Sequence, residues 1–230
     1  MSIFRDLSLA CPACGTLGIE SVAVSLNGPR VPEVVRAIVD GSFHRFCCQA
    51  CGCDFRVDGP LIYTDFERKQ WIGEFPLDWE TSWARLEHQP LDSFRRAMID
   101  FAPPIVRGES SGFVVRAVFG LGALAEKISL FEAGLDDRVV ELTKLVVLLR
   151  SGMTLHPAHR PRFVKRDDHG AHLVLDPVTG DEVAVVSEEE IEQIAADPAW
   201  GPWLRDLATG PYVDIGRFML DGRQRLLEVA

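Results

Sequence analysis

The 230-residue sequence lacks the long apolar run that a membrane-spanning helix needs. Such a helix takes about 18 or more consecutive apolar residues. The longest apolar stretches, 113–125 and 139–149, are shorter than this or broken by charges such as Arg116 and Lys144. Residues 1–10 also lack the apolar core of a secretion signal. We therefore expect a cytoplasmic protein with no membrane partner and reduced thiols, in which paired cysteines favour a metal over a disulfide.

The sequence also lacks a basic block. It has 24 Lys and Arg against 34 Asp and Glu, a formal net charge of −10. Non-specific binding to nucleic acids depends on Lys and Arg side chains that neutralise phosphates. The composition argues against nucleic acid as a partner.

Catalytic motifs are missing as well. There is no Ser/His/Asp arrangement, phosphate-binding loop or metalloprotease helix. We expect Gly120-x-Gly122 to lack the preceding strand of a dinucleotide loop, and it has no third glycine, so we interpret it as a close-packing position. His156 and His159 lie in a proline-flanked loop without acidic or cysteine neighbours, which favours a surface loop. The prediction for catalytic residues is therefore none.

What the sequence does carry is the pattern Cys-x-x-Cys-Gly, once over 11–15 and again over 48–52. Two residues between thiolates let a tight turn present both sulfurs to one ion, and the glycine can take the positive φ that the turn needs. Two such pairs favour Zn²⁺ in a closed tetrahedral site with a structural role. The predicted metal ligands are Cys11, Cys14, Cys48 and Cys51.

Two alternatives use the same sulfurs, and a third exchanges one of them. A rubredoxin-like iron site has the same paired knuckles and would make the chain an electron carrier. A redox dithiol is a second alternative, but no helix is expected to start after Cys14 and stabilise a thiolate. In the third, Cys47 or Cys53 replaces a ligand, although only Cys48 and Cys51 combine the two-residue spacing with a glycine directly after it.

Hydrophobic periodicity predicts an α+β chain. Between the cysteine pairs, Pro32 can begin a helix and Gly41 can end it. Further helices are expected over 91–101, from Leu121 to Gly134, and after Asp136-Asp137. In the last third, Ser187 precedes a helix whose first turn holds Glu188 to Glu190. The expected strands are 19–26, 43–46, 55–57, 61–63, 71–75, 163–165, 171–175, 182–186 and 212–220, with turns at 168–170 and 177–181.

Five segments in order resemble a known family. CPACG, SLNG, PEVVRAIVDGSFHRFCCQACG and LIYTDFERKQWIGEFP resemble the CpXC domain, a bacterial and archaeal domain without an assigned activity. FGLGALAEKISLFEAGLDDRVVELTKL is similar to the region after the cysteine pairs in longer members of the family. The resemblance places the family's paired cysteines on the four predicted ligands. The chain departs from the family at Gln49, where the family name implies proline.

These observations predict three parts: a zinc-ribbon-like unit with an inserted helix and a β-hairpin over 1–77, a helical region over 78–155, and a small α+β module over 156–230. The expected function is a zinc-binding protein-interaction or regulatory module whose partner is another protein or a further copy of the chain. The alternative is an enzyme with a pocket between the parts, using Tyr63, Asp65 or His44. Of the two, the sequence favours the binding module over the enzyme.

Overall fold

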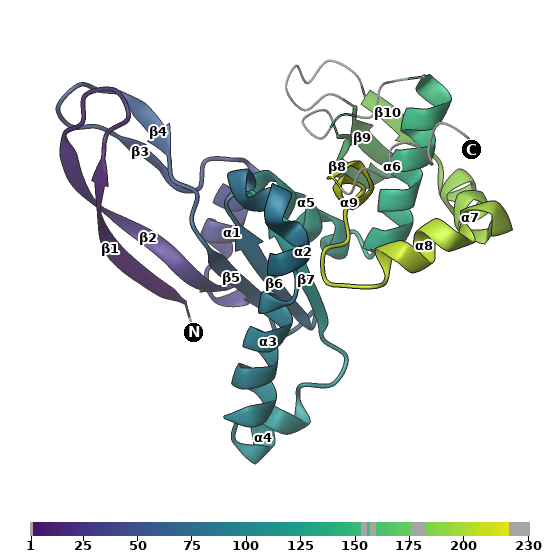
Figure 1. The fold of residues 1–230 in the computed structure, drawn as a ribbon, viewed down its shortest axis with the longest axis horizontal. Coiled ribbons are helices and arrows are strands. Elements are labelled where there is room, and N and C mark those ends of the chain that lie inside the picture. The colour runs from purple at the N-terminus through teal and green to yellow at the C-terminus, as the bar shows by residue number, and fades with distance from the viewer. Residues whose placement is uncertain (1, 153–155, 157–159, 176–182, 221–230) are drawn as a thin grey trace. The chain divides into compact units, whose positions relative to one another are not determined.

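The computed structural model describes residues 2–152, 156, 160–175 and 183–220, and the chain divides into two compact units, Met1–Ala125 and Glu126–Ala230 (Figure 1). Helices and strands occur in both units, as the α+β prediction requires. The three-part division at 77/78 and 155/156 stays a prediction.

The first unit is built on a five-stranded mixed sheet in the order β1-β2-β5-β6-β7. The pairs β1/β2 and β5/β6 are antiparallel, whereas β2/β5 and β6/β7 are parallel. A separate antiparallel pair, β3/β4, precedes β5 in the chain. The strands are β1 (Ile3–Ala10), β2 (Leu17–Asn27), β3 (Arg45–Cys47), β4 (Asp54–Arg56), β5 (Leu61–Asp65), β6 (Gln70–Phe75) and β7 (Val114–Phe119).

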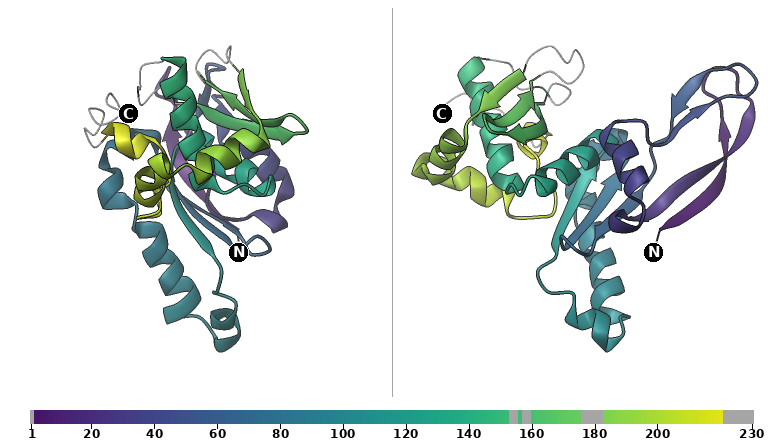
Figure 2. Two further views of the ribbon diagram at one scale, coloured as in Figure 1. Left: turned by 90° about the vertical axis from the view of Figure 1, so that its right-hand side faces the viewer. Right: turned by 180° about the vertical axis from the view of Figure 1, so that it is seen from behind.

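Strands β1 and β2 form a long ribbon that reaches beyond the rest of the sheet (Figures 1 and 2). The last residues of β2, Ser25 to Asn27, pair with β5, while its first half pairs only with β1. Burial agrees with this division, because Val22, Ala23 and Leu26 are buried and Ile19 is 77% exposed. The outer part of the ribbon therefore gains little stability from a hydrophobic core.

Helices of the first unit cover the sheet (Figure 1), and two of them lie where the sequence predicts helices. Helix α1 (Pro32–Val39) has Pro32 in its first turn, and Gly41 comes after it with φ of 76°. Helix α3 (Gln89–Arg95) continues as the π-helical turn η3 (Arg96–Asp100) and packs Phe94 and Met98 on Trp71. The remaining elements are η1 (Gly28–Arg30), η2 (Leu77–Ser82), α2 (Trp83–Leu86) and α4 (Pro104–Gly108).

Strand β7 was not predicted and lies in the region expected to be helical. It pairs along its full length with β6, from Val114 beside Gln70 to Phe119 beside Phe75. The β-branched residues in its sequence, VVRAVF, favour a strand, but this signal was not recognised because it lies within a longer apolar stretch. The expectation that no strand precedes Gly120-x-Gly122 is therefore wrong. Gly120 does sit in a close-packed position, with φ of 82° and its missing Cβ 3.3 Å from Cβ of Leu77.

Helix α5 (Leu121–Glu132) leads into the second unit, where α6 (Asp137–Ser151) runs through the core. The Asp136 side chain caps α6 by accepting a hydrogen bond from the backbone N–H of Arg138, as predicted. One face of α6 packs on a three-stranded sheet and the other on the C-terminal helices. The sheet order is β10-β9-β8, and the elements are β8 (Arg162–Asp167), β9 (Gly170–Val174), β10 (Val183–Val186), α7 (Glu188–Ala196), η4 (Pro198–Trp200), α8 (Gly201–Leu207) and α9 (Gly216–Leu220).

The predictions for the second unit hold for its sheet and for α7, and the turn expected at 177–181 lies outside the described residues. The strand expected over 212–220 is wrong, because this segment ends in α9. Ile215, Phe218 and Met219 all pack on α6, and their three- and four-residue spacing is that of a helix. The Asp214 side chain also accepts a hydrogen bond from the backbone N–H of Gly216 at 2.6 Å, which starts the turn.

Candidate metal centre

The two Cys-x-x-Cys-Gly patterns form the tips of two hairpins. In the β1–β2 tip the N–H of Gly15 donates to the carbonyl of Cys11 at 2.9 Å, and in the β3–β4 tip the N–H of Gly52 donates to the carbonyl of Cys48 at 2.8 Å. The two glycines have φ values of 73° and 71°. Both turns therefore have the same backbone geometry and require glycine at the same place.

The tips meet, so that the four predicted cysteines lie together although more than 30 residues separate the pairs. Their Sγ atoms all lie within 4.8 Å of one another. The Sγ atoms of Cys11 and Cys51 are 3.7 Å apart, and those of Cys14 and Cys48 are also 3.7 Å apart. A tetrahedron with metal–sulfur bonds of about 2.3 Å has edges of about 3.8 Å. These two sulfur–sulfur distances match such an edge, and four cysteine sulfurs are the ligand set of a tetrahedral four-thiolate metal ion.

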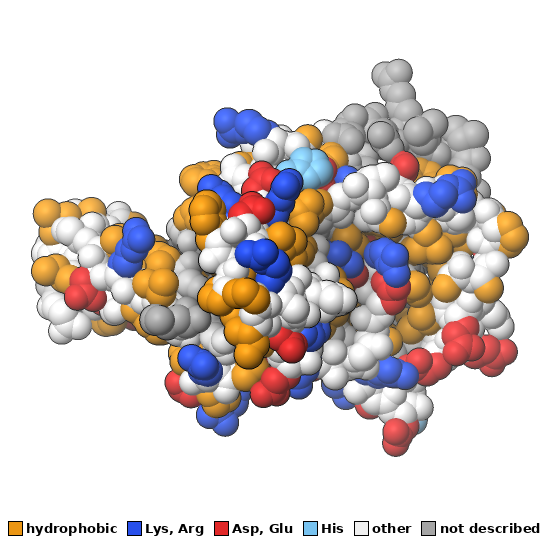
Figure 3. Space-filling model, turned by 90° about the horizontal axis from the view of Figure 1, so that it is seen from below, with side chains coloured by type: hydrophobic (Ala, Val, Ile, Leu, Met, Phe, Trp, Pro, Cys, Tyr) orange, Lys and Arg blue, Asp and Glu red, His pale blue; other side chains and the backbone are white. Residues whose placement is uncertain are grey.

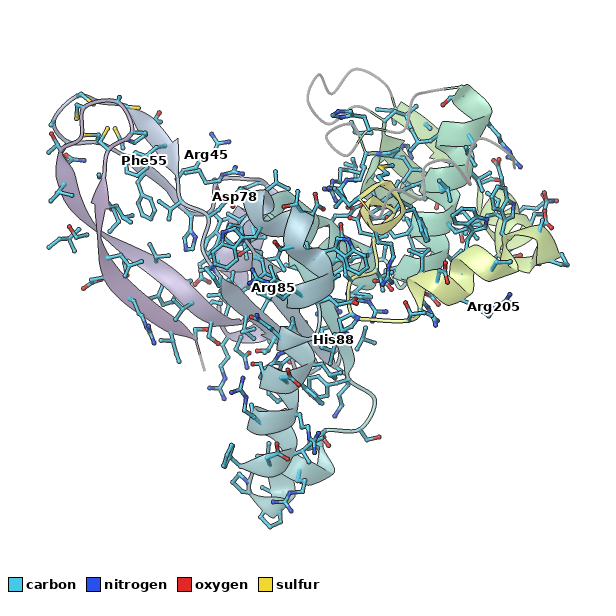
Figure 4. All side chains as sticks on the ribbon, viewed as in Figure 1. Arg45, Phe55, Asp78, Arg85, His88 and Arg205 are labelled. Atoms are coloured by element: carbon cyan, nitrogen blue, oxygen red, sulfur yellow. The ribbon has the colours of Figure 1, made fainter. Side chains whose placement is uncertain are left out.

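The thiols of the cluster are free, and the two members of each pair differ in exposure. Cys11 and Cys48, the first of each pair, are 4% and 8% exposed, whereas Cys14 and Cys51 are exposed. Figure 4 shows the sulfur atoms gathered at the hairpin tips, with the ring of Phe55 on the side toward the rest of the unit. The site therefore lies at the surface, at the outer end of the ribbon.

Electrostatics within the cluster explain why a cation would complete it. Hydrogen bonds from the Thr16 hydroxyl and backbone lower the pKa of Cys14 to about 6. The backbone N–H of Cys53 lowers the pKa of Cys51, but the sulfurs of the other three cysteines and burial outweigh it and raise this pKa to about 12. Without a cation the Cys51 thiol therefore stays protonated, and its hydrogen bond helps to lower the pKa of Cys14. A divalent metal would take the place of that proton.

The two additional cysteines lie outside the cluster. Cys47 is exposed on β3, and the neighbouring Asp54 raises its pKa. Cys53 is half-buried and donates a hydrogen bond to the carbonyl of Asp54 at 3.5 Å. The four cysteines that cluster in the structure are thus those of the two pairs with two residues between the cysteines.

The side chains suggested for an enzyme have structural contacts. His44 is buried, and its Nε2 accepts a hydrogen bond from the backbone N–H of Ala23 at 2.9 Å. Burial lowers the pKa of His44 to about 4, so the imidazole is neutral at neutral pH. Tyr63 is 2% exposed and packs against Gly28, where a Cβ would lie 2.9 Å from Cζ of the tyrosine. The enzyme alternative gains no support from these two residues.

Asp65 caps the turn between β5 and β6. Its Oδ1 accepts hydrogen bonds from the backbone N–H groups of Glu67 and Arg68, both at 2.9 Å, and its Oδ2 pairs with the Arg68 guanidinium at 3.0 Å. Asp65, suggested above for the enzyme alternative, therefore has a structural role in this turn.

Other residues from the sequence analysis lie apart. His156 is exposed, and His159 lies outside the described residues. In the first turn of α7, Glu190 pairs with Arg150 at 2.6 Å and Glu188 with Arg166 at 2.6 Å. This acidic run is a solvated helix start with ion pairs, as its position in the sequence indicated.

Sequence reasoning missed a buried network of charges in the second unit. Lys127 lies 3.0 Å from Asp137, Lys144 lies 2.8 Å from Glu141, and Arg160 lies 2.7 Å from Asp214. Its four cations and four anions balance: Lys127, Lys144, Arg160, Arg162 and Glu126, Asp137, Glu141, Asp214. The sequence does show charged residues within the apolar stretches that form α5 and α6, and these could have indicated buried ion pairs. The members of the network pair with one another, which indicates a structural role.

Glu74 on β6 is a second missed feature. It is 1% exposed, and neither carboxyl oxygen has a hydrogen-bond partner among the described residues. Burial, with a smaller contribution from Asp58, raises the pKa of Glu74 to about 8, so the carboxyl is largely protonated at pH 7. Nothing in the alternation pattern of the strand distinguishes this glutamate from a surface residue.

Comparison with known families gives one match. The family model described as CpXC protein matches residues 9–144, more than half of the chain, and this range contains all four clustered cysteines. No curated protein and no solved structure matches the chain. Among the described residues, no helix is both long and apolar enough to cross a membrane.

Proposed function

Since the chain belongs to the CpXC protein family, we propose that it is a cytoplasmic zinc protein of this family that acts by binding another protein chain. In this proposal Cys11, Cys14, Cys48 and Cys51 hold one structural Zn²⁺. The observation that carries the proposal is the set of four Sγ atoms within 4.8 Å of one another, contributed by two hairpin tips.

Zinc suits the donor set. Zn²⁺ binds four cysteine thiolates tetrahedrally, without a redox change, in structural sites with the same paired spacing. Iron accepts the same four sulfurs, so a rubredoxin-like electron carrier is the alternative that a metal assay and a visible spectrum separate. Reduced thiols are needed for either metal, which is the basis for placing the protein in the cytoplasm.

The metal would act on structure and not on a substrate. Four protein thiolates fill every position of a tetrahedral ion, so no position remains for water or a reactant. The part of the ribbon beyond the sheet has few buried residues, and β3 and β4 have three residues each. Binding energy at the tips therefore adds to the folding free energy of this region.

A role in protein binding is supported by the surface of the same ribbon. Large apolar side chains on β1 and β2 are left in solvent, among them Phe4 at 45% and Leu17 at 69% exposure. Figure 3 shows hydrophobic side chains on the lobe that the ribbon and the β3–β4 hairpin form. Apolar side chains gathered on one projecting element are typical of an interaction surface. The metal would hold this surface in shape.

The test is to measure folding of the ribbon with and without metal. We expect a chelator to release the metal, to lower the midpoint of thermal unfolding and to make the hairpin tips sensitive to protease. Cys11→Ser should reproduce the loss, whereas Cys47→Ser, which alters an exposed cysteine outside the cluster, should not. A chain that binds no metal, or that melts identically after chelation, would contradict the proposal.

A further inference from the structure

Strand β1 is an open edge of the five-stranded sheet. It pairs on one side with β2, and the order of strands places nothing on its other side among the described residues. All of its eight residues are exposed except Leu9, which is half-buried. Long exposed edge strands present a row of unpaired N–H and C=O groups to any further strand.

The hairpin fixes which backbone groups point outward. The backbone N–H of Cys11 donates to the carbonyl of Thr16 at 2.9 Å, and the register continues unshifted from Leu17 opposite Ala10 to Ala23 opposite Phe4. Hydrogen-bonded and non-hydrogen-bonded pairs alternate along an antiparallel ladder. The odd-numbered residues of β1 therefore bond to β2. The outward-pointing groups belong to Phe4, Asp6, Ser8 and Ala10.

One face of the ribbon also leaves apolar side chains uncovered. Phe4 and Ala10 point to the same face, and their partners on β2 place Leu17 on that face as well. Ile19, opposite Ser8, is 77% exposed there. This face is apolar at its ends and lies beside the open edge.

We propose that β1 pairs with β1 of a second copy of this chain, antiparallel and symmetric about Leu7. The inference rests on the proposed function, because it names the partner chain and requires the metal-held ribbon. Hydrogen-bonded pairs then join Phe4 to Ala10 of the second copy and Asp6 to Ser8 of the second copy, each occurring twice by symmetry. Leu7 faces Leu7 of the second copy.

Symmetry and charge select this register. Residues that lie opposite each other in an antiparallel pair of strands point to the same face of the sheet. A two-fold axis also keeps each side chain on the same face in both copies, so the axis must lie between the two copies of one residue. The two registers with most overlap are centred on Asp6 and on Leu7, and the first places two aspartates opposite each other, which is destabilising. The register about Leu7 places no like charges opposite. It also sets Phe4 of the second copy beside the small Ala10, within reach of the exposed Leu17.

A second copy is a suitable partner on charge as well. The chain carries a net charge of −10, so two copies repel unless they meet through a neutral surface. Strand β1 is such a surface, because its only charged side chains are Arg5 and Asp6, which cancel.

The experiment uses the full metal-loaded chain in sedimentation or light scattering over a range of concentrations. We expect a mass of twice the 25.5 kDa chain, falling to the monomer on dilution. Ser8→Pro removes an outward N–H and leaves the bonds to β2 in place, so it should abolish the dimer while thermal unfolding and metal content persist. Ser8→Ala is the matched control and should remain dimeric.

Register is tested by cross-linking. Leu7→Cys should give a disulfide-linked dimer on mild oxidation, since only the register about Leu7 places this residue opposite itself, and Arg5→Cys should not. A chain that is monomeric at all concentrations, a dimer that Ser8→Pro leaves intact, or cross-linking through Arg5→Cys would overturn the proposal. Metal content measured on the same samples separates this failure from failure of the zinc site, because a monomer with full metal content contradicts only the pairing.

Discussion

The imidazole of His44 accepts a hydrogen bond from the backbone N–H of Ala23 at 2.9 Å and so joins the start of the β3–β4 hairpin to β2 of the ribbon. His44 precedes β3 directly and is buried. The two hairpins are thus connected at two places, by this hydrogen bond near their base and by the four sulfurs at their tips.

This contact makes stability depend on pH. Burial lowers the pKa of His44 from 6.5 to about 4, so the unfolded chain binds a proton more readily than the folded one between these values. Stability supplied by the neutral imidazole is therefore full above pH 6.5 and declines as the pH falls toward 4. We expect His44→Gln, which keeps an acceptor but does not titrate, to lose less stability over this range in urea unfolding. Parallel curves for the two proteins would contradict this assignment.

Glu74 produces the opposite trend. Its folded pKa of about 8 lies above the ordinary value of 4.5, so the folded chain holds a proton that the unfolded chain releases. Stability should fall as the pH rises from 4.5 to 8, by up to about 1.4 kcal/mol for each pH unit. Glu74→Gln should be more stable than the wild type at pH 7, and the difference should grow toward pH 8. A difference in unfolding free energy between Glu74→Gln and the wild type that is the same at pH 5 and at pH 8 would show that Glu74 is ionised or solvated in the folded chain.

The buried charge network predicts a large loss when one partner is removed. Lys144 pairs with both Glu126 and Glu141, and all three side chains are at most 3% exposed. Lys144→Met leaves two buried carboxylates with fewer partners and should cost about 3–5 kcal/mol of unfolding free energy. Lys165→Met removes a pair with Asp167 in which the lysine is 59% exposed, and should cost less than about 1 kcal/mol. Similar losses in both variants would contradict the importance of burial.

The glycines that directly follow the two cysteine pairs give a prediction that does not depend on changing a sulfur ligand. Gly15 and Gly52 have positive φ and open space at the Cβ position, so Gly15→Ala should introduce backbone strain of about 1–2 kcal/mol without a steric clash. We expect weaker metal affinity in a competition titration with a chelator. Gly59→Ala, where φ is not positive and the Cβ position is also open, is the control and should bind metal like the wild type.

Local patterns predicted much of this fold. The cluster of four cysteines could be predicted from their spacing, because two residues between cysteines and a glycine after the second favour a tight turn that presents both sulfurs to one point. Helices α1, α5 and α6 could be predicted from their caps and apolar stripes. Strand β7 was missed because a continuous apolar stretch does not distinguish a buried strand from a helix by periodicity. Helix α9 was misassigned although Ile215, Phe218 and Met219 have helical spacing, because so short an apolar segment also fits a strand and only its packing on α6 decides between the two.

Neither the buried charge network nor the burial of Glu74 could be predicted from local sequence patterns. The burial of Lys144 depends on how α5, α6 and β8 pack together, and a lysine in a helix is ordinarily a surface residue. The exposed edge of β1 could not be foreseen either, because strand order is a property of the whole sheet.

Whether Cys11, Cys14, Cys48 and Cys51 bind one structural zinc ion is tested by metal analysis, with a visible absorption spectrum, of the purified, reduced chain. We expect about one zinc per chain, no visible band, and loss of the metal in Cys48→Ser but not in Cys53→Ser. Red protein with iron would instead indicate an electron carrier, and a folded chain free of metal with reactive thiols would show that the four cysteines are not a structural metal site.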